Sequence, residues 1–160
     1  RAGAGLTTIA SPREALSINA ASSLAVMVRP VDGAVELAEF LADRRRNAVV
    51  LGPGGGVGQT MRDQVHAALA STAAVVLDAD ALTSFAEAPA ALASAIAKRA
   101  GLDVVLTPHE GEFSRLFKAI DNDPHVHAKL EKARLAARTS GAVFLFKGAD
   151  TVVAAPDGRA

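Results

Sequence analysis

Short apolar runs alternate along the chain with longer alanine-rich stretches in which apolar residues recur at helical spacing. Runs of this length, bounded by Gly, Pro or charged residues, predict strands, and the alanine-rich stretches predict helices. Because the first six predicted strands are apolar over nearly their whole length, we expect them to be fully buried. The predicted strands are Leu6–Ala10, Ala25–Val28, Ala48–Leu51, Ala74–Leu77, Asp103–Leu106, Val143–Phe146 and Thr151–Ala154.

The predicted helices lie between these strands. Ser11 followed by Pro12 is typical of a helix start, with the hydroxyl as the cap. Residues 33–46 form an amphipathic pattern whose last turn carries Arg44, Arg45 and Arg46, where the helix dipole favours cations. This alternation predicts an α/β fold with a mostly parallel sheet and helices on both faces. Further helices are predicted at Gln59–Ala70, Ala88–Arg99, Glu110–Lys118 and His125–Thr139.

Length and the two chain ends indicate one incomplete domain. A chain of 160 residues with 50% hydrophobic content is enough for one buried core and does not require two. The chain starts at Arg1 without a methionine, and it ends in the turn residues Pro156, Asp157 and Gly158 without a returning strand. We therefore expect residues 1–160 to be a single domain with further segments before and after it.

Composition excludes several classes of function. Lys plus Arg and Asp plus Glu both number 17, so no basic surface for nucleic acid is expected. The chain has no cysteine, which fits a cytoplasmic location and excludes zinc sites of the Cys type. No apolar run approaches the roughly 20 residues that a membrane span needs. His66, His125 and His127 lack the spacing and the third group of a metal site, so no metal bound by side chains is expected.

In a parallel sheet, ligands bind outside the carboxyl ends of the strands. Four of these ends carry residues that can bind a ligand or take part in catalysis. We expect the four ends to converge on one edge of the sheet. They read "GPGGGVG" after Leu51, "DAD" after Leu77, "TPHEGE" after Leu106 and "KGADT" after Phe146.

The glycine-rich segment fits neither of two well-known phosphate-binding motifs. Pro53 and Gln59 occupy the glycine and lysine positions of a P-loop, and the spacing G-x-G-x-x-G fails at Val57 or Gln59. What remains is a turn of glycines, which have no side chains. Its backbone could approach an anion or a flat ring near a helix N-terminus. The alternative is a tight connection that needs positive φ angles.

The other three strand ends also allow two interpretations each. Asp78 and Asp80 suit a sugar hydroxyl or a hydrated magnesium ion, or else they cap the next helix. Lys147 and Thr151 flank a glycine turn that could reach a phosphate or adenine, or else the lysine is merely solvated. Glu112, like Glu110, falls in a first helical turn where acids are favoured, and His109 is either a surface or capping histidine or a contact to the substrate.

Five segments together resemble the carboxyl-terminal domain of the ADP- or ATP-dependent NAD(P)H-hydrate dehydratases. In chain order they are "RAGAGLTTIA", "VVLGPGGG", "VVLDADAL", "VLTPHEGEFSRL" and "FLFKGADTVVAAPDGR". The resemblance implies a ribokinase-like three-layer α/β fold. The reaction it implies is phosphorylation of the hydroxyl on the (S)-hydrate of NADH or NADPH, followed by loss of phosphate that restores the nicotinamide ring.

The resemblance also implies roles for individual residues. Mg²⁺ is expected to be held mainly by the phosphates of ADP or ATP and by water. Gly55 and Thr83 depart from the family, in which leucine and asparagine are common at these positions. The expected contacts to the hydrate are Gly54, Gly56 and His109, with Asp78 and Asp80 beside them. The expected contacts to the nucleotide are Lys147, Gly148, Ala149, Asp150 and Thr151.

The catalytic base is expected outside this chain. Relatives of this fold carry it as the aspartate of a Gly-x-Gly-Asp segment, which we expect downstream of Ala160, so residues 1–160 alone should be inactive. The resemblance further implies a homo-oligomer and allows an epimerase domain upstream. Two alternatives remain open: another ribokinase-like kinase acting on a vitamin precursor or sugar, and a nucleotide-binding or assembly module without turnover.

Overall fold

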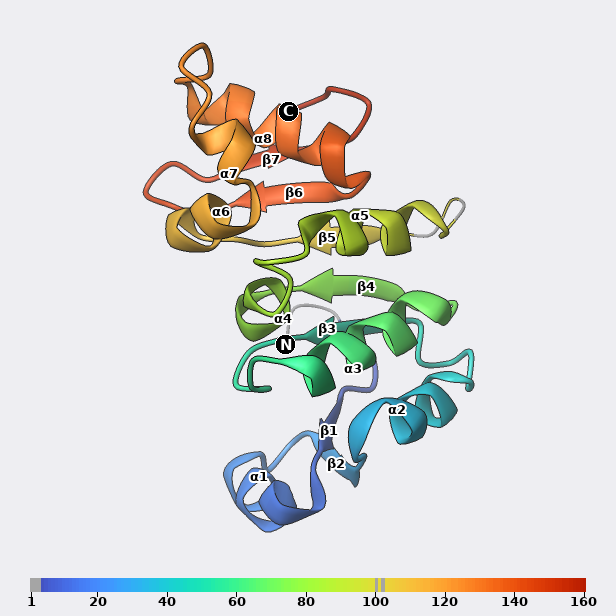
Figure 1. The fold of residues 1–160 in the computed structure, drawn as a ribbon. Coiled ribbons are helices and arrows are strands. Elements are labelled where there is room, and N and C mark those ends of the chain that lie inside the picture. Colours follow the sequence, from blue (N-terminus) through green and yellow to red (C-terminus); the bar gives the residue numbers. More distant parts are fainter. Residues whose placement is uncertain (1–3, 100, 102) are drawn as a thin grey trace.

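The computed structural model describes residues 4–99, 101 and 103–160, and its helices and strands alternate along most of the chain (Figure 1). The elements are β1 (Thr8–Ser11), the 3-10 helix η1 (Arg13–Ala15), α1 (Leu16–Ser22), β2 (Met27–Pro30), α2 (Gly33–Leu41), β3 (Ala48–Leu51), α3 (Gln59–Ala70), β4 (Ala74–Leu77), α4 (Ala79–Thr83), α5 (Pro89–Ala97), β5 (Val104–Leu106), α6 (Glu110–Leu116), α7 (Lys118–Asp121), α8 (Lys129–Ser140), β6 (Val143–Phe146) and β7 (Val152–Ala154).

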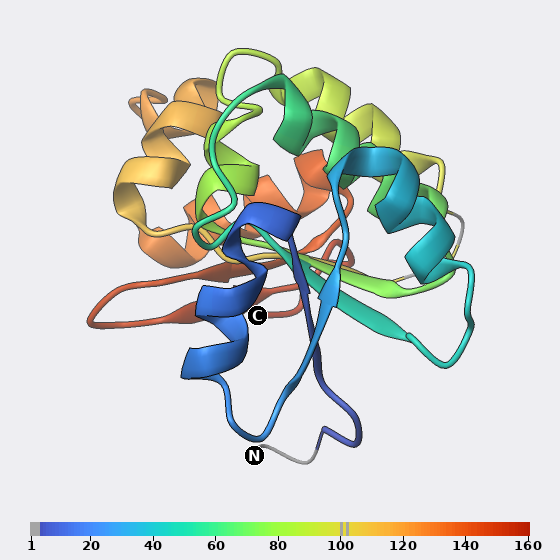
Figure 2. The same ribbon diagram turned by 90° about the horizontal axis from the view of Figure 1, so that it is seen from below.

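The main sheet has five strands in the order β3-β4-β5-β6-β7. The first four are parallel, and β7 runs antiparallel to β6. When parallel strands are added in sequence order, right-handed crossovers place every connecting helix on the same face. Figure 2 shows α2, α3 and α5–α7 on one side of this sheet. β1 and β2 form a separate parallel pair, against which α1 packs.

Burial alternates along the strands of the main sheet. Leu77, Leu106 and Phe144 point into the helical layer and are 0% exposed, whereas Val50 and Val153, on the other face, are 63% and 51% exposed. The expectation of fully buried strands is therefore wrong. One face is buried because the described helices cover that face alone, whereas the sequence predicts helices on both faces. β1 is half-buried and β2 is largely exposed.

Four phenylalanines join α6 to β6 in the core. The Phe113 and Phe146 rings stack with centroids 4.4 Å apart, and Phe117 and Phe144 meet edge to face at 5.3 Å. Buried aromatic pairs of this kind contribute about 1 kcal/mol beyond their buried area. They fix the start of α6, and with it His109, relative to the end of β6.

The predicted helix over residues 33–46 ends early. α2 stops at Leu41, because Asp43 accepts hydrogen bonds from the backbone and guanidinium of Arg45 and so stabilises a turn. Arg46 lies with its guanidinium carbon 3.8 Å from the centroid of the Phe40 ring. The three arginines therefore do not form the last turn of this helix.

One predicted helix cap and one predicted helix start are also wrong. Ser11 does not cap a helix, because its hydroxyl donates to Pro12 O and accepts from Asn19. The last long helix begins at Lys129, not at His125, because Asp123 accepts the His125 N–H at 2.9 Å and turns the chain before α8. No helix in the described part of the chain is both long and apolar enough to cross a membrane.

Candidate active site at the carboxyl edge of the sheet

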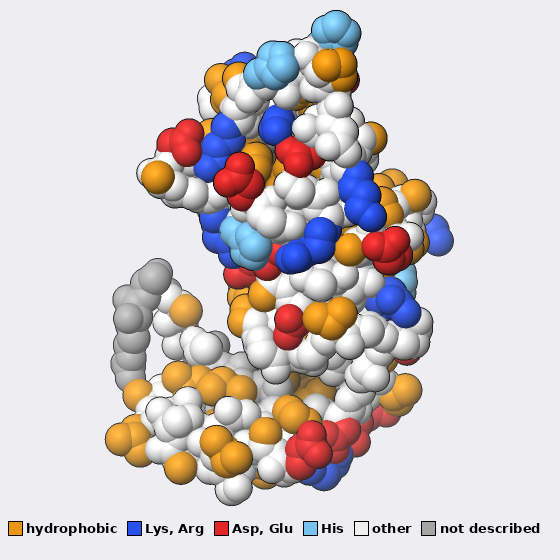
Figure 3. All heavy atoms as spheres, turned by 60° about the vertical axis from the view of Figure 1, so that its left-hand side comes forward, with side chains coloured by type: hydrophobic (Ala, Val, Ile, Leu, Met, Phe, Trp, Pro, Cys, Tyr) orange, Lys and Arg blue, Asp and Glu red, His pale blue; other side chains and the backbone are white. Residues whose placement is uncertain are grey.

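The four strand ends converge on one edge of the main sheet, as predicted. Backbone hydrogen bonds continue past the strands and hold the connections together: Asp78 N–H donates to Leu51 O at 3.0 Å, and Lys147 N–H to Pro108 O at 2.9 Å. In Figure 1 the arrowheads of β4 and β6 point to the left, and Figure 3 brings that side forward. Acidic, basic and histidine side chains gather about the middle of this face.

The glycine-rich loop after β3 is a tight turn with positive φ angles, which is one of its two predicted interpretations. Gly54 and Gly56 have φ of 65° and 80°, so the backbone needs positive φ there, and a Cβ at either position would meet open space. The loop is therefore a tight turn that also leaves room for a ligand. Gly52 differs, because its Cβ would overlap Asp78 O. Gly55 differs again, because a side chain at this position would collide with Met61.

Asp80 fastens the glycine loop to α4. Its Oδ2 accepts the Gly56 N–H at 2.9 Å, and one turn later Ser84 Oγ accepts the Gly58 N–H at 3.1 Å. Ser84 also donates to Asp80 O at 2.6 Å. The carboxylate of Asp80 is thus engaged with a backbone amide, and the role of Ser84 was not anticipated from the sequence because its partner lies 26 residues away.

Asp78 connects three elements. Its Oδ1 caps α4 by accepting the Ala79 N–H at 2.8 Å, and it pairs with Lys147 Nζ at 2.6 Å. Burial alone would raise the pKa of Asp78. The hydrogen bonds from Lys147 and Ala79 and the charge of Lys147 outweigh burial, so the pKa lies below its usual value. Ala79 adopts φ 45°, an uncommon conformation for a residue with a Cβ, which places Asp78 and Asp80 on either side of a sharp bend.

His109 has the capping role that was one of its two interpretations from the sequence. It is the N-cap of α6: its Nδ1 accepts the Gly111 N–H at 3.0 Å, and Glu112 Oε2 accepts the His109 N–H at 2.9 Å. This is a capping box with histidine in the place of serine or threonine. Because Nδ1 accepts, the ring proton lies on Nε2, which is 3.3 Å from Glu112 Oε1. The side chain remains 54% exposed and accessible from the edge of the sheet.

The loop of residues 147–151 joins β6 to β7 and projects from the left side of Figure 1. Its residues Gly148, Ala149, Asp150 and Thr151 are exposed, and Thr151 Oγ1 donates to Gly148 O at 3.1 Å. Lys129 from α8 also reaches this loop, donating to Lys147 O and to Asp150. The sequence interpretation missed Lys129, since nothing in its local pattern distinguishes it from other lysines on the helix.

Side chains suited to metal ions do not cluster at this edge. Among residues 4–99, 101 and 103–160 there is no group of three or more His, Cys, Asp or Glu placed to hold an ion. Asp78 is paired with Lys147, and Asp80 accepts from a backbone amide. His66 lies on α3 with its ring edge to face against Phe85 at 5.6 Å. A magnesium ion at this edge would therefore need its ligands from a bound nucleotide and water.

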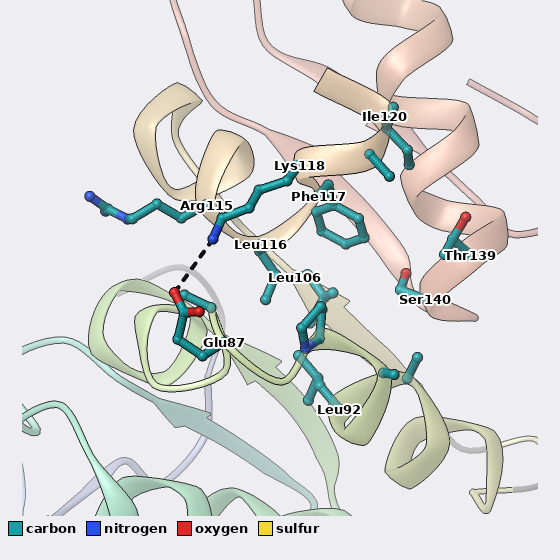
Figure 4. Close-up of a pocket in the computed structure, with 15 residues that line it drawn as sticks. Glu87, Leu92, Leu106, Arg115, Leu116, Phe117, Lys118, Ile120, Thr139 and Ser140 are labelled. Atoms are coloured by element: carbon teal, nitrogen blue, oxygen red, sulfur yellow. Dashed lines mark hydrogen bonds and ion pairs between the residues drawn. The ribbon is translucent and has the colours of Figure 1, made fainter. Parts of the chain in front are cut away.

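A separate cavity of about 480 Å³ lies within the helical layer (Figure 4). Its lining is mainly apolar and includes Leu92, Phe117 and Ile120. Lys118 and Glu87 form an ion pair at 3.5 Å, drawn as a dashed line in Figure 4. None of the predicted site residues lines this cavity.

Comparison with known proteins points to one enzyme family. The family profile described as NAD(P)H-hydrate dehydratase matches residues 1–160. The bifunctional NAD(P)H-hydrate repair enzyme Nnr of Synechocystis is 34% identical over 98% of this chain, which covers 29% of that protein. The rat ATP-dependent (S)-NAD(P)H-hydrate dehydratase is 36% identical over 78% of this chain, which covers 36% of that protein.

A solved structure shares the fold. The ADP/ATP-dependent NAD(P)H-hydrate dehydratase of Bacillus subtilis, co-crystallised with ATP and Mg²⁺ and soaked with CoA, superposes with a TM-score of 0.73 at 27% identity. The match covers 98% of this chain and 54% of the Bacillus chain. This confirms the α/β, ribokinase-like fold predicted from the sequence. The glycine loop, the aspartates, His109 and the 147–151 loop thus meet on a scaffold shared with these enzymes, and the chain belongs to the NAD(P)H-hydrate dehydratase family.

Proposed function

We propose that the protein containing this chain uses ADP or ATP to dehydrate the (S)-epimer of NAD(P)H hydrate and so repairs nicotinamide nucleotides. The chain spans about a third of the length of the curated relatives above and about half of the solved one. The observation that carries the proposal is the meeting of four strand-end segments at one sheet edge, linked by the Lys147–Asp78 pair.

The hydrate binds on the β3 and β5 side of this edge. Gly54 and Gly56 offer a backbone surface with open space above it, on which a flat nicotinamide ring can lie. His109 presents a half-exposed ring next to the same edge. Its Nδ1 is used by α6, whereas its Nε2, 3.3 Å from Glu112 Oε1, makes no hydrogen bond to another described residue and is available to the hydrate. Asp78 and Asp80 act here by shaping the site.

The adenine nucleotide binds along the loop after β6. The exposed segment Gly148, Ala149, Asp150 and Thr151 supplies backbone groups and one hydroxyl, and Lys147 supplies a positive charge at its base. Mg²⁺ enters with the phosphates of the nucleotide, which provide its main ligands together with water. Positioning and charge neutralisation are the main requirements of phosphoryl transfer, and this loop contributes to both.

In the first step the hydroxyl of the hydrate loses its proton and takes a phosphoryl group from the nucleotide. In the second the phosphate leaves together with a proton from the neighbouring ring carbon, which restores the ring double bond. We assign no residue of this chain as the base. The ion pair with Lys147 lowers the pKa of Asp78 and makes it a weaker base, and Asp80 holds the glycine loop through the Gly56 amide, so we give both a positioning role. For that role our prediction remains an aspartate outside residues 1–160. A homo-oligomeric state and an upstream epimerase domain also remain predictions.

The test is an assay of the full-length protein with (S)-NADPH hydrate and either MgATP or MgADP. We expect recovery of NADPH absorbance together with release of one inorganic phosphate per turnover, and loss of both in the Lys147→Met variant. Phosphorylation of vitamin-precursor alcohols or sugars without action on the hydrate would instead support the kinase alternative. Nucleotide binding without turnover of either class would support a binding module.

A further inference from the structure

Lys129 lies in the first turn of α8, and its ammonium reaches into the loop of residues 147–151. Its Nζ donates to Lys147 O at 3.2 Å, to Asp150 O at 2.5 Å and to Asp150 Oδ1 at 3.1 Å. A lysine ammonium has three N–H donors, and here each has an acceptor in the same loop. The loop is therefore folded around this one charge.

Two further features show that the position of Lys129 is specified. Its Nζ lies 4.8 Å from the centroid of the Phe146 ring, within the range of a cation–π contact, and its side chain is only 22% exposed. A Cβ at Gly148 would collide with Nζ, although Gly148 is not among the glycines with positive φ. A methyl group at this position would therefore require the ammonium to move, whereas the backbone conformation itself does not require glycine.

We propose that Lys129 is a positioning residue of the nucleotide site, which holds the 147–151 loop in the shape that the adenine nucleotide meets. This inference rests on the proposed function, because it assumes that the nucleotide binds at this loop. Among the described residues, the one other side-chain hydrogen bond within the loop runs from Thr151 Oγ1 to Gly148 O. A loop that is ordered before binding lowers the entropy cost of binding, so removing Lys129 weakens nucleotide affinity.

The first test compares three variants of the full-length enzyme. Lys129→Met keeps the aliphatic stem against Phe146 and removes the charge, so we expect the KM for MgATP to rise about tenfold. The kcat and the KM for the hydrate should stay within about twofold, and Lys129→Arg should recover most of the affinity. Lys132→Met is the matched control, because Lys132 lies one turn further along α8 and pairs with Asp121, away from the loop.

The outcomes separate this inference from the proposed function. A Lys129→Met enzyme with unchanged KM for MgATP, in a wild-type background that binds the nucleotide, overturns the role of Lys129 and leaves the proposed function standing. A wild-type protein that does not bind MgATP overturns both. Reduced thermal stability without a change in nucleotide KM also counts against the inference, since it shows a structural role alone.

The second test uses the contact between Lys129 and Gly148. Gly148→Ala should displace the ammonium and raise the KM for MgATP about as much as Lys129→Ala, and the double variant should be no worse than either single one. Additive effects would show that the two residues act independently and would overturn the inference. Hydrogen exchange of the ligand-free protein provides a readout that does not involve the nucleotide: the amides of residues 148–151 should exchange faster in Lys129→Met than in Lys132→Met.

Discussion

Lys147 Nζ lies 2.6 Å from Asp78 Oδ1, although 69 residues separate them in the sequence. The pair connects the end of β6 to the end of β4 across the intervening strand β5. Because Asp78 also caps α4, a single carboxylate links the loop proposed to bind the nucleotide to the helix that holds the glycine loop. The two halves of the candidate site are therefore connected through this pair.

The Asp78–Lys147 pair should make stability depend on pH. The pKa of Asp78 is lowered in the folded protein, so its contribution is present above the ordinary value of about 3.9 and is lost as the pH falls through the lowered one. We expect Asp78→Asn to cost about 1 kcal/mol at neutral pH, since both groups are partly exposed. Urea unfolding at several pH values should show this difference shrinking below about pH 4. A difference that stays constant into strong acid would contradict the assignment.

The two roles of His109 can be separated by substitution. His109→Ala should cost about 1 kcal/mol of stability, because α6 loses the acceptor at its N-cap. His109→Asn restores a good N-cap but lacks the imidazole ring, so it should recover most of this stability. If the ring also contacts the hydrate, both variants raise the KM for the hydrate several-fold. Thermal unfolding and steady-state kinetics on the same preparations check this. A wild-type KM for the hydrate in His109→Asn would mean that His109 acts only as a helix cap.

Much of the fold is predictable from the sequence where distinct residues mark the end of a strand. β3, β4 and β6 have the predicted bounds, because each apolar run ends at a glycine, aspartate or lysine that leaves the sheet. The α4 helix has only five residues, too few for a helical period to be visible. The exposure of β2 and the partial exposure of β1 could not be predicted, since an apolar run does not say which elements cover it.

The candidate site is predictable at the level of segments and not at the level of pairs. The rule that ligands bind at the carboxyl ends of parallel strands brought four segments together correctly. It could not show that Asp78 faces Lys147, that Asp80 holds Gly56, or that Lys129 lies inside the 147–151 loop. These contacts depend on the register of strands and on helix rotation, which are set by packing across the whole domain.

The glycines of the loop after β3 should differ in their tolerance to substitution. Gly52→Ala places a methyl group onto Asp78 O at φ 123°, so we expect a loss of more than about 3 kcal/mol in the free energy of unfolding. Gly54→Ala has positive φ but open space around its Cβ, and it should cost only about 1 kcal/mol. Chemical denaturation of both variants provides the comparison. Equal losses would mean that the close approach of β3 to Asp78 is not needed.

Asp80 should control hydrate binding through the glycine loop. Asp80→Ala removes the acceptor of the Gly56 N–H, and the freed loop must then be ordered when the substrate binds. We expect the KM for the hydrate to rise about fivefold with little change in the KM for MgATP, because the 147–151 loop is untouched.

Asp80→Asn keeps an acceptor and should be close to wild type. Thr83→Ala is the matched control, since Thr83 lies on the same helix without a side-chain hydrogen bond among the described residues. Steady-state kinetics with each substrate varied in turn separates the two KM values. An equal rise in both KM values would mean that Asp80 stabilises the whole edge of the sheet and has no specific effect on the glycine loop.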